Sequence, residues 1–172
     1  MHMIFRTIWI FLTRRFLPKS GINEMTEISM RVMPTDLDYL WHVNNGVYFS
    51  LMDFGRWNMI FRNGVFDECM KRGWYSVVAA EKIKFRKSLE LWDKFTLRTQ
   101  ILGHDEKYFF IQQRFFRKDE LMATGLVKVR FLKRAGGTVS TKEVLDGLNA
   151  TMETNLGELS GEWMAMEAKY FN

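Results

Sequence analysis

Residues 35–56 read TDLDYLWHVNNGVYFSLMDFGR, a dense polar group that runs directly into an apolar segment. Two carboxylates, an imidazole and two carboxamides fall between Asp36 and Asn45. Asn44 and Asn45 are both favourable N-cap residues, and apolar side chains follow at once. The junction therefore predicts the beginning of a helix immediately after the polar group.

This helix is expected to organise the rest of the chain. It should run to about Arg62 and end at Asn63-Gly64, a common C-terminal signal. Apolar residues fall on nearly every side of it, which is typical of a helix buried in a core. Its N-terminus carries backbone N–H groups and a partial positive charge that can polarise a carbonyl or hold an oxyanion.

Asp38 precedes this N-terminus by a few residues. A carboxylate in that position suits a hydrolytic site, either by attacking directly or by activating a water molecule. The same residues also suit a purely structural interpretation, in which the acids and asparagines form turns and caps and His42 is a hydrogen-bonded, half-buried side chain. The residues alone leave both interpretations open.

The pattern of Asp36-Leu37-Asp38, His42-Val43-Asn44-Asn45 and Tyr48, with Asp53 and Arg56 downstream, resembles the segment that enters the central helix of hot-dog-fold thioesterases. These form the superfamily of 4-hydroxybenzoyl-CoA thioesterase and the plant acyl-ACP thioesterases. A nearer likeness, to thioesterase superfamily member 6 and its bacterial relatives, runs from residue 31 to residue 54 and continues in residues 80–89 and 102–105. The resemblance implies an α+β hot-dog fold, an antiparallel β-sheet wrapped around a long central helix.

The resemblance also implies an activity, hydrolysis of acyl-CoA or acyl-carrier thioesters. Asp38 would be the nucleophile or the general base, and His42 would orient or polarise. Asn44 or Asn45 would start the helix whose N–H groups bind the oxyanion. The expected catalytic residues are Asp38, His42 and Asn45, and the expected substrate-binding residues are Asn44, Tyr48 and Asp53. For Asp53, an ion pair with Arg56 three residues later is the alternative.

Leu40 departs from the pattern of the plant enzymes, which carry an asparagine two residues after the aspartate. A leucine side chain cannot hydrogen-bond a carboxylate or a water molecule. The alternative function is therefore a non-catalytic acyl-CoA- or lipid-binding hot-dog module. A hot-dog hydratase would place an Asn-Pro step between its Asp and His, and Asp38 to His42 has none.

Composition predicts one compact domain, since 172 residues with 47% hydrophobic content can fill a sizeable core. We expect a basic amphipathic segment at 1–22, the hot-dog domain at 23–150 and a tail, possibly helical, at 151–172. Cys69 is the only cysteine, which indicates a reducing compartment such as the cytoplasm. Because the histidines and Cys69 lie far apart, no metal is expected, and no other cofactor.

The net charge of +5 comes from basic residues scattered among acids, so nucleic acid is not the expected partner. The phosphates of an acyl-CoA suit this charge better. The resemblance adds a homo-oligomer, a dimer or tetramer, with active sites where two subunits meet.

Residues 1–20 carry four basic residues and no acid, and their apolar residues gather on one broad side of a helix. The segment is too short and too charged to span a bilayer. Packing on the domain or on a partner subunit is slightly favoured, and peripheral contact with a membrane, through Trp9 and the arginines, is the alternative.

The rest of the chain predicts strands and short helices in alternation. Period-two patterns and turn signals indicate strands at about 27–32, 74–87, 92–102, 107–117 and 120–133. Helices are expected at 65–72, 141–148 and 162–170, the second capped by Ser140 or Thr141. Consecutive strands joined by tight turns form an antiparallel meander.

Overall fold

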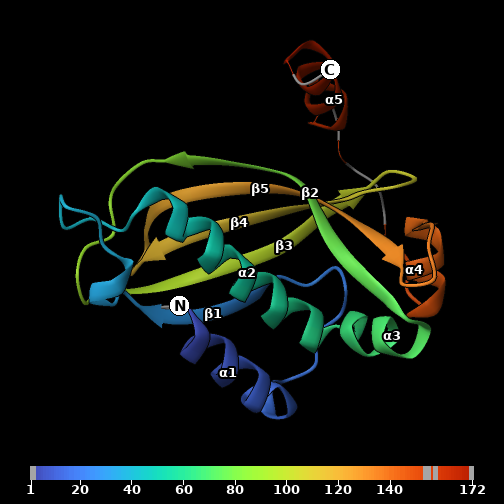
Figure 1. Ribbon diagram of the computed structural model, residues 1–172, viewed down its shortest axis with the longest axis horizontal. Helices are drawn as coiled ribbons and strands as arrows, with labels where there is room; N and C mark the ends of the chain where they lie inside the picture. The colour runs from blue at the N-terminus through green and yellow to red at the C-terminus, as the bar shows by residue number, and fades with distance from the viewer. Residues whose placement is uncertain (1–2, 153–155, 157–158, 171–172) are drawn as a thin grey trace.

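The computed structural model describes residues 3–152, 156 and 159–170, and its main feature is a curved antiparallel sheet (Figure 1). The strand order is β1-β3-β4-β5-β2, and a short strand, β6, pairs antiparallel with the end of β5. The strands are β1 (Thr26–Arg31), β2 (Trp74–Phe85), β3 (Lys94–His104), β4 (Phe109–Arg117), β5 (Glu120–Lys133) and β6 (Thr138–Val139). This arrangement confirms the predicted meander and the α+β class.

Helix α2 (Asn45–Arg62) lies along the concave face of the sheet and contacts β1 and β3 (Figure 1). Its limits confirm the prediction: the Asn44 side chain caps its first turn, and Asn63 is its C-cap residue. Most of the first three turns is buried, including Tyr48, Leu51 and Met52. Burying these side chains against the sheet supplies much of the hydrophobic stabilisation of the domain.

The sheet curves around α2 because three of its strand pairs are irregular. The register shifts at Val78/Ala80 in β2 and at Ile101/Gly103 in β3, and in the β4–β5 pair it shifts between Phe115 and Phe116, where Met122 of β5 is the extra residue. An extra residue on one strand bends that strand and increases its twist. The strands can therefore curve around one helix and still keep their backbone hydrogen bonds.

Gly55 sets how closely α2 approaches the sheet. A Cβ at this position would lie 2.6 Å from both Gln113 Nε2 and Thr99 Oγ1, and 2.8 Å from Leu97 Cδ2. Any larger residue would therefore push the helix or these side chains away. The close approach allows Gln113 to donate hydrogen bonds to Met52 O (2.9 Å) and Thr99 Oγ1 (3.1 Å).

Two strands begin later than the sequence pattern predicts, because turns occupy the preceding residues. Asp93 closes a turn with Glu90 through two hydrogen bonds, and Trp92 has a left-handed φ of 66°, so β3 starts at Lys94. Asp105 Oδ1 accepts from the N–H groups of Lys107 and Tyr108, so β4 starts at Phe109. Aspartate side chains stabilise such turns in competition with strand pairing.

The remaining helices follow the sequence predictions closely. Helix α3 (Val65–Arg72) ends at Gly73, and α4 (Thr141–Gly147) begins with a capping box between Ser140 and Glu143. The expected tail helix forms as α5 (Leu159–Tyr170). Residues 153–155, 157–158 and 171–172 of the expected tail, and residues 1–2 of the expected N-terminal segment, lie outside the described residues.

Helix α1 (Ile4–Thr13), followed by the 3-10 turn η1 (Arg14–Phe16), packs on the domain through one face. Ile10 is buried, and the ring of Phe11 meets those of Trp57 and Phe61 edge to face. Among the helices in the described part of the chain, none is both long enough and apolar enough to cross a membrane.

Candidate active site

The loop that carries Asp38 is a tight hairpin held by backbone hydrogen bonds. Leu37 and Val43 form an isolated antiparallel bridge, and the Asp38 N–H donates to His42 O at 2.8 Å. The Trp41 N–H donates to Asp38 O at 3.1 Å, with Trp41 in the left-handed region at φ 62°. The chain therefore reverses direction between Asp38 and His42.

Two backbone N–H groups hold the Asp38 carboxylate. Its Oδ1 accepts from Leu40 N at 2.9 Å and from His42 N at 3.3 Å. Asp38 Oδ2 has no hydrogen-bond partner within the described residues. The contact from position 40 to Asp38 is thus made by the backbone N–H.

The hairpin leads directly into the N-terminus of α2. Asn44 Oδ1 accepts from Gly46 N at 2.8 Å, and Asn44 O accepts from Val47 N at 2.9 Å. In the described part of the chain the N–H of Asn45 has no hydrogen-bond partner. Residues 44–46 are exposed, so this positive end of the helix dipole is open to an incoming carbonyl.

Neighbouring segments fix the hairpin in place. The Val43 N–H donates to Leu89 O at 3.0 Å, and the Leu89 N–H donates to the Tyr48 hydroxyl at 3.3 Å. Tyr48 is 2% exposed, and burial raises the pKa of its hydroxyl. Its ring packs edge-on against Phe85 and Phe115, so Tyr48 lies in the core beneath the hairpin.

Asp36, the other acid of the polar group, has a different environment. It is 1% exposed and forms a two-pronged ion pair with Arg6 of α1, at 3.0 Å and 2.7 Å. Its Oδ2 also accepts from the Met33 N–H at 2.8 Å. Asp36 is therefore occupied in joining α1 to the loop, whereas the Asp38 carboxylate keeps a free oxygen.

Asp53 lies farther along α2, in a second polar cluster. Arg56, 8% exposed, contacts Asp53 Oδ1 at 2.5 Å and Glu81 Oε1 of β2 at 2.6 Å. Its Nη1 also donates to Gln113 Oε1 at 2.9 Å. The Asp53–Arg56 ion pair predicted from helical spacing is therefore present, and the Asp53 side chain remains 50% exposed.

Glu81 is a partly desolvated member of this cluster. Its Oε1 is buried and lies 2.6 Å from Arg56 Nη1, an ion pair that is its closest polar contact within the described residues. Burial raises the pKa of the Glu81 carboxyl, and the Arg56 charge opposes that rise. Sequence reasoning missed both Glu81 and Gln113. The one available signal was an acid in the second half of a strand, directly before its lysines.

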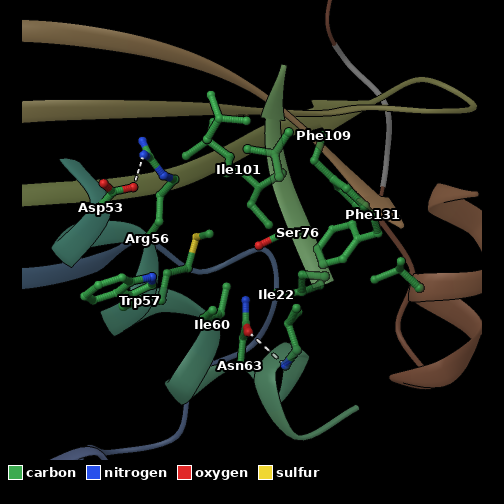
Figure 2. Close-up of a pocket in the computed structure, with 16 residues that line it drawn as sticks. Ile22, Asp53, Arg56, Trp57, Ile60, Asn63, Ser76, Ile101, Phe109 and Phe131 are labelled. Atoms are coloured by element: carbon green, nitrogen blue, oxygen red, sulfur yellow. Dashed lines mark hydrogen bonds and ion pairs between the residues drawn. The ribbon is translucent and has the colours of Figure 1, made fainter. Parts of the chain in front are cut away.

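A cavity of about 140 Å³ opens between α2 and the sheet, with Asp53 and Arg56 at its polar end (Figure 2). Its other walls are mainly apolar and include Ile60, Ile101 and Phe131. Of the predicted site residues, Asp53 lines this cavity. Asp38, His42, Asn44 and Asn45 are brought together at the hairpin and the start of α2.

No group of three or more His, Cys, Asp or Glu side chains with metal-binding geometry occurs among the described residues. Cys69 is buried, and burial raises the pKa of its thiol to about 11.

A sheet curved around a central helix, with a carboxylate beside the helix N-terminus, is the architecture of the hot-dog thioesterases. Residues 32–155 match the family model described as "Thioesterase-like superfamily", and the chain belongs to this family. A search of curated proteins finds "Protein THEM6" of Xenopus laevis, 39% identical over 97 residues. That alignment covers 56% of this chain and 47% of the relative, so the chain spans about half the length of that protein.

Solved structures confirm the hot-dog fold. The probable thioesterase YbaW of Escherichia coli superposes with a TM-score of 0.66 at 20% identity, covering 71% of this chain and 95% of YbaW. A hypothetical protein of Staphylococcus aureus, solved in complex with CoA, gives a TM-score of 0.66 at 16% identity. That match covers 82% of this chain and 95% of the other.

Proposed function

We propose that this protein hydrolyses acyl thioesters of CoA or of an acyl carrier, with Asp38 as the catalytic carboxylate. The main support for this proposal is the hairpin geometry. Two backbone N–H groups hold Asp38 Oδ1, and Oδ2 has no partner within the described residues. The family assignment, a neighbour named as a probable thioesterase and another bound to CoA support the same reaction class.

In this proposal the thioester carbonyl oxygen points at the N-terminus of α2, where the Asn45 N–H is open. A donor placed where negative charge develops lowers the barrier to forming the tetrahedral intermediate. Asn44 holds the first turn in shape, and Asn45 provides the donor. His42 orients the carboxylate through its backbone N–H. We assign to its side chain the role of polarising the reacting groups.

Asp38 can act in two ways. As a general base it takes a proton from water, the water oxygen attacks the carbonyl carbon, and the proton passes to the departing thiolate. As a nucleophile its oxygen attacks the carbon and expels the thiolate, and water then hydrolyses the mixed anhydride. Label found in the Asp38 carboxylate after a single turnover in water labelled with heavy oxygen identifies the nucleophilic route, because the general-base route leaves the carboxylate oxygens unchanged.

We place the acyl chain along α2, in the cavity between the helix and the sheet. The polar end of that cavity at Asp53 supports a substrate-binding role for this residue. Tyr48 is buried and does not line that cavity, so we propose that it supports the site from beneath the hairpin, where its hydroxyl accepts from the Leu89 N–H. This chemistry belongs to lipid metabolism, and the single buried cysteine is consistent with the cytoplasm.

We further propose that the functional unit is a homodimer or tetramer. Strand β2 pairs with β5 along one edge and has no strand on its other edge in the described part of the chain. The tip of the hairpin is also exposed: Tyr39 is 88% exposed and Trp41 69%. A long free strand edge and an exposed aromatic loop are surfaces that a second subunit can cover.

The first test is thiol release from a panel of short-chain, long-chain and aromatic acyl-CoA thioesters, with acyl-CoA binding measured by calorimetry. Turnover of at least one substrate supports the proposal. Binding without any turnover supports the alternative, an acyl-CoA- or lipid-binding module, which the apolar cavity would also suit. Absence of both turnover and binding would contradict both functions.

A further inference from the structure

Helix α1 has two apolar stripes, and only one of them packs on the domain. The packed stripe contains Ile10, 3% exposed. The other stripe, which we call the outer stripe, faces away from the domain. It consists of Phe5 (80% exposed), Trp9 (69%), Leu12 (69%) and Phe16 (87%).

The spacing explains why the two stripes lie on opposite sides. Phe5, Trp9 and Leu12 are separated by four and three positions, so they fall on one narrow face of α1 at 100° per residue, and Phe16 follows from the 3-10 turn η1. Ile10 lies on the opposite face. Figure 1 shows α1 at the periphery of the molecule, below β1 and beside α2. Packing on the domain therefore leaves the outer stripe uncovered.

The position of α1 is firmly fixed. Arg6 forms the two-pronged ion pair with the buried Asp36 and also donates to Arg31 O at 2.7 Å. Arg14 lies 4.9 Å above the ring of Phe66. Because charged contacts and a buried apolar stripe hold the helix, the outer stripe is presented as a rigid surface.

The charge of the same segment indicates what covers this stripe. Residues 1–20 carry four basic residues, and the first acid of the chain is Glu24. Arg15 and Lys19, both exposed, have no ion pair within the described residues. A second copy of the chain on this stripe would bring two positively charged segments together, whereas an anionic surface would be complementary.

We propose that the outer stripe docks the protein on the surface of an anionic lipid bilayer, with α1 parallel to the membrane plane. Phe5, Trp9, Leu12 and Phe16 enter the boundary between headgroups and acyl chains, where aromatic side chains are favoured. Arg15 and Lys19 contact the lipid phosphates. This inference is independent of thioester hydrolysis, because none of these residues belongs to the candidate active site.

The test is flotation of the full chain with neutral phosphatidylcholine vesicles and with vesicles that also contain phosphatidylglycerol. We expect binding to the anionic vesicles that weakens as salt is raised. The Trp9→Ser/Phe16→Ser variant should lose binding by about tenfold or more, since two of four anchors are removed. The Met70→Ser/Trp92→Ser variant removes two exposed apolar side chains elsewhere and should bind like the unmodified chain.

Circular dichroism and size-exclusion chromatography accompany the flotation, so that misfolding and altered assembly are seen. Lack of binding by the unmodified, folded chain to either kind of vesicle would overturn the proposal. Equal loss of binding in both double variants would also overturn it. If Trp9→Ser/Phe16→Ser instead dissociates an oligomer without affecting flotation, the stripe is an interface between copies and the membrane assignment is wrong.

Discussion

Replacing Gly55 with alanine tests how closely α2 lies against the sheet. The new Cβ would sit 2.6 Å from Gln113 Nε2 and Thr99 Oγ1, far inside van der Waals contact. Alanine gains about 1 kcal/mol over glycine through helix propensity. Overpacking of the core opposes this by about 1–3 kcal/mol. Displacing Gln113 from its buried hydrogen bonds costs about 1–3 kcal/mol more.

The net expectation for Gly55→Ala is a loss of about 3 kcal/mol in the free energy of unfolding. Urea unfolding at fixed protein concentration measures it as a lower midpoint with an unchanged slope. Gly161→Ala is the matched control, because it is also helical and a Cβ there meets nothing within 4 Å. If Gly55→Ala is as stable as the unmodified chain, the helix does not approach the sheet as described.

Three further predictions concern charged and titratable groups. Arg6→Met leaves the Asp36 carboxylate buried without its partner and should lower stability at pH 7 by about 3 kcal/mol. A loss below about 1 kcal/mol in urea unfolding would refute that role for the ion pair. The Cys69 thiol has a pKa of about 11, so little thiolate is present at neutral pH and a thiol reagent should react with it only slowly. Rapid stoichiometric labelling of the folded protein would contradict its burial. The pKa of Glu81 is raised above its ordinary 4.5 in the folded chain, so the folded state binds more protons than the unfolded state. The contribution of Glu81 to the free energy of unfolding therefore falls as the pH rises from about 4.5 through the folded pKa. Glu81→Gln should remove that part of the pH dependence in urea unfolding, and an unchanged profile would refute the assignment.

The sequence predicted features that depend on neighbours along the chain. Asn44 and Asn63 bound α2 because capping needs only local backbone geometry. The Asp53–Arg56 ion pair follows from helical spacing. The turns at Trp92 and Asp105 were placed less well, since aspartate side chains there compete with strand pairing.

Features that depend on the three-dimensional arrangement were missed. Arg6 meets Asp36 across thirty positions, and Arg56 meets Gln113 across fifty-seven. Predicting such pairs requires knowledge of the sheet register and of the path of α1. The periodicity of apolar residues along the sequence does not contain that information. The backbone N–H of Leu40 bonds to Asp38, a contact that the identity of the side chain does not predict. The sequence identifies each side chain, whereas the direction of a backbone N–H depends on the fold.

The central claim is that Asp38 carries the chemistry, and its most direct test is the hydrolysis rate of Asp38→Asn on the best thioester substrate. Asparagine keeps the size and the Oδ1 acceptor but is neither a base nor a comparable nucleophile. We predict that kcat falls by about a hundredfold or more while acyl-CoA binding persists. The exposed acid Asp67 of α3 provides the matched control, and Asp67→Asn should keep full activity. If Asp38→Asn retains kcat within a few-fold of the unmodified chain, another group performs the hydrolysis and the assignment of Asp38 is wrong.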